Sequence, residues 1–133
     1  MYKRQSIDHI DQQRAVTEWH IHPDYGRRGH DDIALVKLSS PLDGVAPMPL
    51  NVDPIEEAWL GEELTYIGYG ATSDSGEGAG TKRYAEIPID GYDEHFVYGL
   101  DLEDNQNVCY GDSGGGALRH QEGIGYSLSL IHI

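Results

Sequence analysis

The sequence predicts an all-β chain, and three observations support this fold class. Its 133 residues include seventeen Gly, six Pro and nine Tyr. Short apolar runs recur between clusters of turn-forming residues, and no long segment has the 3.6-residue period of an amphipathic helix. The length fits one domain or part of one. No apolar stretch approaches the length needed to span a membrane.

The first elements alternate between strands and turns. Residues 15–21 alternate in polarity and are predicted to form a strand, which a turn over 22–26 ends. A polar loop over 27–31 leads into a second, largely apolar strand over 32–38. Ser39, Ser40 and Pro41 end that strand.

The rest of the chain continues as short strands between loops. The strand over 63–69 is predicted to place Leu64, Tyr66 and Gly68 on one face and Thr65, Ile67 and Tyr69 on the other. Regularly spaced short strands favour a sandwich or a barrel. The remaining elements expected here are an extended crossing segment over 45–54, one helical turn over 56–59, a loop over 71–80, a strand over 83–89, an acidic loop over 101–107 and a hairpin turn over 119–123.

Charge and cysteine content narrow the possible partners. The formal net charge is −14, which repels phosphate backbones and argues against a nucleic-acid partner. The N-terminal residues lack the apolar core of a secretory signal. Cys109 is alone in the chain, so it is either a buried thiol or one half of a disulfide whose partner lies elsewhere.

The two ends of the chain look foreign to it. MYKRQ and LSLIHI correspond to translations of the two orientations of one transposon mosaic-end adaptor, although an ordinary start and an ordinary final strand remain the alternative. We therefore expect residues 1–5 and 128–133 to be adaptor-derived. On this hypothesis residues 6–127 are a piece of a longer gene.

One run carries the chemistry, Gly111-Asp112-Ser113-Gly114-Gly115. It satisfies the G-x-S-x-G pattern of α/β-hydrolases, but that pattern needs a helix after the serine and an Asp and a His downstream. No Asp follows Ser113, and three glycines are a poor helix start. The chain order Asp, His, Ser would have to use His95 as the base, and its fold needs helices that this sequence does not predict. The remaining order places the His first, then the Asp, then the Ser.

Four features in this order resemble the chymotrypsin/trypsin family of serine proteases. They are the run 111–115, the acid motif Asp32-Ile33-Ala34-Leu35, the preceding His22-Pro23-x-Tyr25, and Tyr66-Ile67-Gly68-Tyr69-Gly70, which stands where the family has a G-W-G strand end. The resemblance implies a fragment of the two-barrel, Greek-key fold. It would comprise the end of the first barrel over 6–45, a crossing segment over 46–57 and a partial second barrel over 58–127.

The resemblance also implies roles for the catalytic residues. Ser113 would be the nucleophile, and Asp32 the carboxylate that orients the histidine base. The N–H groups of Gly111 and Ser113 would form the oxyanion hole, which stabilises charge that develops in the transition state. Asp112 would pair with a new N-terminal ammonium after zymogen cleavage.

Two further positions follow from the same resemblance. Asn107, six residues before Ser113, would form the base of the substrate pocket. Because Asn is neutral, we do not expect a strict preference for Arg or Lys at the cleavage site. Cys109 would bridge to a cysteine beyond the chain, with a structural free thiol as the alternative.

The histidine base is missing from the expected place. In the family the histidine lies about 45 residues before the acid. Counted back from Asp32, that position would precede residue 1. His9, His20 and His22 lie too close to Asp32 along the chain, and His30 is two residues away. We therefore expect this chain to lack the base and to be inactive by itself.

The prediction is a serine endopeptidase that cleaves proteins or peptides through an acyl-enzyme. We expect no cofactor, no metal at His20 and His22, no nucleic-acid or membrane partner, a monomeric parent and an extracellular location. Two alternatives remain. One is a catalytically dead homologue that acts as a binding or regulatory module, and the other is an α/β-hydrolase esterase.

Overall fold

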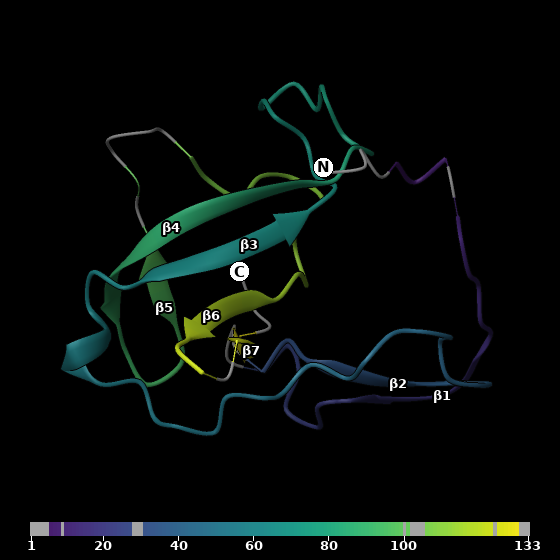
Figure 1. Cartoon of the computed structure of the whole chain (residues 1–133), viewed down its shortest axis with the longest axis horizontal. Coiled ribbons are helices and arrows are strands. Elements are labelled where there is room, and N and C mark those ends of the chain that lie inside the picture. The colour runs from purple at the N-terminus through teal and green to yellow at the C-terminus, as the bar shows by residue number, and fades with distance from the viewer. Residues whose placement is uncertain are drawn as a thin grey trace. The chain divides into compact units, whose positions relative to one another are not determined.

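The computed structural model describes residues 6–8, 10–27, 31–99, 101, 106–123 and 125–130. The described residues divide into two compact units. One contains residues 6–8 and the residues from Met48 onward, and the other contains the residues between His9 and Pro47. Regular structure in the described ranges consists of antiparallel strands and one short 3-10 turn, which confirms the all-β prediction (Figure 1).

The larger unit is built on a five-stranded antiparallel sheet. Its strands are β3 (Glu63–Gly68), β4 (Arg83–Tyr92), β5 (Val97–Gly99), β6 (Ala117–Gln121) and β7 (Gly125–Leu130). The order across the sheet is β5-β4-β3-β6-β7, so β3 lies in the middle with β4 and β6 on either side (Figure 1). The pairing of β3 with β6 brings the segment after Tyr66 close to the segment before Ala117.

The core of this unit lies on one face of the sheet. Leu64, Ile89 and Ala117 are almost fully buried and pack with Trp59. Trp59 ends the 3-10 turn η1 (Glu57–Trp59), where a helical turn was predicted. The predicted alternation along β3 is also confirmed, since Leu64 is 1% exposed and Ile67 is 39% exposed.

An arginine closes one side of this core. The Arg119 guanidinium lies 3.7 Å from the centre of the Trp59 ring. Its Nε and Nη2 donate to the two carboxylate oxygens of Glu62 at 2.8 and 3.0 Å. The ion pair with Glu62 raises the pKa of Arg119. The Arg119 guanidinium thus covers the Trp59 ring while it is held in place by Glu62.

The predicted crossing segment extends the sheet at β7. Asn51 N–H donates to Leu128 O, and Leu128 N–H donates to Pro49 O, both at 2.8 Å. These bonds form a parallel bridge between Leu50 and Leu128. The backbone of residues 128–130 belongs to β7, although the adaptor hypothesis had excluded these residues from the fold.

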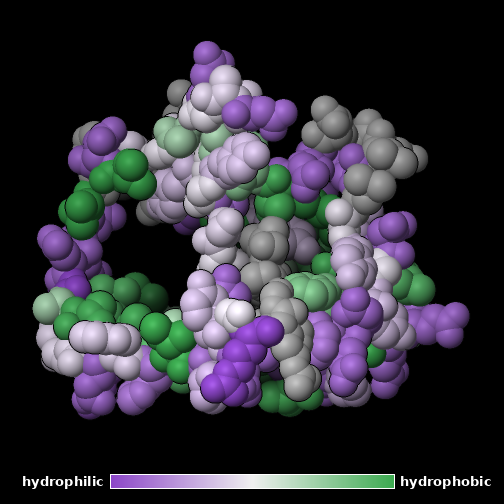
Figure 2. Space-filling view, turned by 180° about the vertical axis from the view of Figure 1, so that it is seen from behind, coloured by the Kyte–Doolittle hydropathy of each residue, from purple (hydrophilic) through white to green (hydrophobic). Residues whose placement is uncertain are grey.

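The smaller unit is a two-stranded ribbon with chemically different faces. Strand β1 (Val16–Ile21) pairs antiparallel with β2 (Ala34–Leu38). The register matches Trp19 with Val36 and Ile21 with Ala34, so these side chains share one face. Trp19 is 68% exposed and Val36 is 59% exposed. Figure 2 shows hydrophobic side chains gathered over these two strands.

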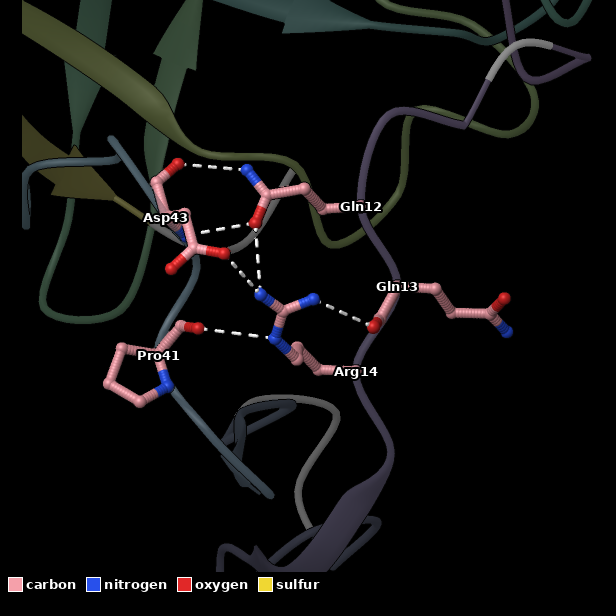
Figure 3. A network of polar contacts seen from close by, with 5 residues as sticks. All are labelled: Gln12, Gln13, Arg14, Pro41 and Asp43. Atoms are coloured by element: carbon pink, nitrogen blue, oxygen red, sulfur yellow. Dashed lines mark hydrogen bonds and ion pairs between the residues drawn. The ribbon is translucent and has the colours of Figure 1, made fainter.

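A polar network joins the two chain segments at one end of this ribbon (Figure 3). Arg14 Nη2 forms an ion pair with Asp43 Oδ2 at 2.9 Å, and Arg14 Nε donates to Pro41 O at 3.2 Å. Gln12 donates to Asp43 O and accepts from Asp43 N–H, both at 2.8 Å. The network therefore links the segment before β1 to the turn after β2.

Several elements differ from the prediction. The hairpin expected over 119–123 turns later, at Glu122 and Gly123, because β6 continues through Gln121 to pair with Gly125. Strand β5 was not predicted, and β4 runs three residues beyond Ile89 to pair with it. No helix in the described residues is long and apolar enough to cross a membrane.

Candidate active site

The predicted nucleophile lies in a tight double turn before β6. Asp112 N–H donates to Cys109 O at 3.0 Å, and Gly115 N–H donates to Asp112 O at 2.9 Å. Gly111 has a φ of +93° and Gly114 a φ of +81°, values that strongly favour glycine. Ser113 lies between them and its side chain is exposed to solvent.

The side chain of Asp112 anchors this turn to the end of β3. Its two carboxylate oxygens accept hydrogen bonds from Gly70 N–H at 2.8 Å and from Cys109 N–H at 3.0 Å. A Cβ atom at Gly68 would overlap Asp112 Oδ1, and one at Gly70 would lie 2.5 Å from the carboxylate. Both glycines therefore form the hollow that holds Asp112.

Two N–H groups in the turn remain available. Among the described residues, the N–H groups of Gly111 and Ser113 have no hydrogen-bond acceptor, whereas those of Asp112 and Gly115 do. Both belong to the residues that flank Asp112 in the turn. Both N–H groups are therefore available for the predicted oxyanion hole, which needs two donors that converge on one oxygen.

A cavity of about 630 Å³ lies beside the anchored turn. Asn107, Cys109 and Asp112 contribute to its wall, together with residues from β3 and β4. Val108 N–H donates to Asn107 Oδ1 at 2.9 Å, so the amide NH₂ is the donor that Asn107 can offer. The Cys109 thiol is free in this chain, and Sγ lies 3.8 Å from Ser73 O.

The predicted acid belongs to the other unit. Asp32 lies two residues before β2 and is exposed within the ribbon unit. The residue before it, Asp31, has a φ of +65° and places Oδ1 4.0 Å from His22 Nδ1. The backbone N–H of His22 donates to Ile33 O at 3.0 Å, which ties the residue after Asp32 to the end of β1.

The described histidines each have a neighbour of their own. His22 lies near Asp31, and His20 Nε2 lies 3.9 Å from a carboxylate oxygen of Glu18. His120 packs against Tyr126 with ring centres 5.0 Å apart. His95 packs edge-on against the ring of the residue that follows it. His9 and His30 lie outside the described residues.

The comparison with known families shows the family of the chain. A family model described as Trypsin matches residues 2–129. The chain belongs to the trypsin family. Membership supports a protease-type function with protein or peptide substrates, and the observed all-β architecture agrees with a fragment of the trypsin-like barrel fold. A search of curated proteins found no match to the chain.

Sequence reasoning found the serine turn but missed what holds it. Gly68 and Gly70 were recognised only as part of a family motif, and their contact with Asp112 was not foreseen. The signal was present in the sequence as two glycines at a strand end. Within the described ranges, no three His, Cys, Asp or Glu side chains gather closely enough to bind a metal ion.

Proposed function

We propose that this trypsin-family chain carries the nucleophile and the acid of a serine endopeptidase. Ser113 attacks the substrate carbonyl and forms an acyl-enzyme, and Asp32 orients a histidine base. The observation that supports this most strongly is the anchored turn with an exposed Ser113 and two unoccupied N–H donors.

The turn supplies what acyl transfer needs from the backbone. The N–H groups of Gly111 and Ser113 donate to the oxyanion of the tetrahedral intermediate, where each donor contributes about 3 kcal/mol. Asp112 keeps these donors in place because its carboxylate is bonded at both oxygens. With these two hydrogen bonds Asp112 acts as a positioning residue for the turn. Its pairing with an N-terminal ammonium is a further proposal.

Asn107 would select the substrate side chain that enters beside the serine turn. Its amide is neutral and offers hydrogen-bond donors, so it does not favour a cationic side chain in the way a carboxylate does. The proposed base lies outside the described histidines, each of which has another neighbour. We further propose that the protein acts outside the cell.

Chemical rescue with imidazole tests this function on the chain, for which the sequence predicts no histidine base. The chain would be treated with an activated p-nitrophenyl ester in the presence and absence of imidazole, and the acylated residue would be located by mass mapping. Imidazole can replace an absent histidine as general base. We expect imidazole to accelerate acylation of Ser113 and the Ser113→Ala variant to lose this reaction.

Ser75 provides the matched control. It is an exposed serine in a loop of the same unit, and its hydroxyl lies near that of Ser73. The Ser75→Ala variant should acylate at the rate of the unmodified chain. Equal acylation of Ser113 and Ser75 would show that the turn does not activate its serine, and would contradict the proposed function.

A further inference from the structure

Two Asp-Gly pairs lie in different parts of the fold. Asp43-Gly44 lies in the exposed turn after β2, and Asp90-Gly91 lies inside β4. An aspartate before a glycine is open to one intramolecular reaction, because glycine has no Cβ atom to shield its backbone nitrogen. That nitrogen attacks Cγ of the aspartate and closes a succinimide ring. The chain therefore contains the same pair of residues in two backbone settings.

The reacting groups of Asp43-Gly44 are accessible. The Asp43 side chain is 90% exposed. Among the described residues, the Gly44 N–H has no hydrogen-bond acceptor. Gly44 has a φ of +69°, and a Cβ atom there would meet nothing within 4 Å. Neither packing nor a hydrogen bond in the described part of the chain therefore shields the nitrogen that attacks.

Gln12 and Arg14 form a clamp on Asp43 (Figure 3). Gln12 accepts from Asp43 N–H and donates to Asp43 O, both at 2.8 Å. Arg14 Nη2 donates to Asp43 Oδ2 at 2.9 Å. The carboxyl group reacts in its protonated form, because water is then the leaving group, so it has to give up the ion pair with Arg14. The clamp therefore opposes ring closure, but its ion pair is an exposed one and restrains the carboxylate only weakly.

The sheet holds the second pair more firmly. Ile89 and Gly91, the residues on either side of Asp90, both pair with β5, and Asp90 is the bulged residue between them. Ile89 N–H also donates to Glu62 O at 2.9 Å. Ring closure at Asp90 therefore requires local opening of the sheet, whereas ring closure at Asp43 requires only release of the clamp.

We propose that Asp43 is a site of spontaneous conversion to isoaspartate, and that the clamp sets its rate. Gly44 N forms a bond to Asp43 Cγ, and the proton of Gly44 N leaves together with the carboxyl hydroxyl as water. A water molecule then opens the succinimide at one of its two carbonyl carbons. Opening at the former backbone carbonyl of Asp43 leaves Gly44 joined through Cγ, which is isoaspartate, and opening at Cγ restores aspartate. The sequence of steps consumes no oxidant, reductant or cofactor.

Conversion releases this end of the ribbon from the clamp. The main chain of isoaspartate runs through Cβ and Cγ, so the path from residue 43 to residue 44 is one carbon longer. Asp43 O, which accepts from Gln12, becomes part of a free carboxylate. The turn after β2 then no longer matches the segment before β1. The proposal goes beyond the proposed function and does not depend on Ser113.

Peptide mapping of the full chain after long incubation in water enriched in heavy oxygen tests the modification. Each ring opening takes one oxygen atom from the solvent, and electron-transfer fragmentation distinguishes isoaspartate from aspartate at each position. Under native conditions we expect Asp43 to convert about tenfold faster than Asp90, or more, because Asp90 has to wait for the sheet to open. In concentrated urea neither pair keeps its native contacts, so the two rates should agree within about twofold.

Two arginine variants test the role of the clamp. Arg14→Gln removes the ion pair with Asp43, and should speed conversion of Asp43 about threefold without changing the rate at Asp90. Arg27→Gln is the matched control, because Arg27 forms an ion pair of the same length, 2.9 Å, with Asp24 in the same unit. This control should leave the rate at Asp43 unchanged.

Three results would overturn the proposal. They are the absence of isoaspartate and of heavy oxygen at Asp43, a ratio of the two rates that is the same in native buffer and in urea, and an Arg14→Gln variant that converts no faster than the unmodified chain. The first two are measured on the unmodified chain, so they decide the matter even where a variant does not fold. Acylation of Ser113 is measured separately, so failure of one proposal leaves the other standing.

Discussion

Replacing Gly68 by alanine tests whether Asp112 and the end of β3 are fitted to each other. The new Cβ atom would overlap Asp112 Oδ1, so the carboxylate would have to move. Movement would break the hydrogen bonds from Gly70 N–H and Cys109 N–H. Because each hydrogen bond to a charged group contributes about 1.5 to 3 kcal/mol, and water partly replaces them at this half-buried site, we expect a loss of about 2 to 4 kcal/mol in the free energy of unfolding.

Urea denaturation followed by far-ultraviolet circular dichroism measures this loss, with Gly91→Ala as the matched control. Gly91 also lies in a strand, and a Cβ atom there would meet only Tyr98 Cδ2 at 3.8 Å. The control should change the free energy of unfolding by less than about 1 kcal/mol, with stabilisation the expected direction.

A double-mutant cycle identifies the cause of the loss. In an Asp112→Ala background the obstructing carboxylate is absent, so Gly68→Ala should cost less than about 1 kcal/mol. A Gly68→Ala variant as stable as the unmodified chain would refute the reasoning. So would an equal loss with and without the Asp112 side chain.

Three other predictions follow from charged groups. Arg119→Met should destabilise the larger unit by about 2 kcal/mol in urea denaturation, because the half-buried Glu62 loses two charge-assisted hydrogen bonds; a Glu62→Gln loss that adds fully to it would contradict this coupling. Hydrogen bonds from the Tyr98 hydroxyl and two backbone N–H groups lower the pKa of Asp93, so its contribution to stability is present above the pKa of the unfolded chain and is lost as the pH falls through the folded value; carboxyl carbon NMR should show this low pKa, and Tyr98→Phe should raise it. Arg14→Lys should speed amide exchange in β1 and β2 severalfold, since lysine cannot reproduce the guanidinium fork; unchanged exchange would show that the network does not hold the ribbon.

Much of the fold was predictable because the strands alternate in polarity. The period of two along β3 correctly placed Leu64 and Ile67 on opposite faces, of which the structure buries that of Leu64. Strand β5 was not predictable in this way, since its three residues, Val97-Tyr98-Gly99, are too few to show an alternation in polarity. The turn at Glu122 and Gly123 was placed too early because Arg119 and Gln121 are polar, yet their backbone continues the ladder of β6.

The serine turn was predictable and its surroundings were not. Glycines on both sides of Ser113 indicate a backbone that needs positive φ, and the structure has it at Gly111 and Gly114. The docking of Asp112 against Gly68 and Gly70 joins residues more than forty positions apart. No local pattern encodes such a contact. A cavity of about 290 Å³ lined by Tyr66 and Phe96 also depends on tertiary structure, because Tyr66 lies in β3 and Phe96 lies in the loop before β5.

The central claim is that Ser113 is the nucleophile of a serine endopeptidase. The most direct measurement is the site of modification when the protein expressed from its source gene reacts with a fluorophosphonate, with peptide cleavage followed in the same sample. The account predicts one adduct, on Ser113, and loss of cleavage in proportion to labelling. A product that cleaves peptides while Ser113 stays unmodified, or one that neither labels nor cleaves, would contradict it.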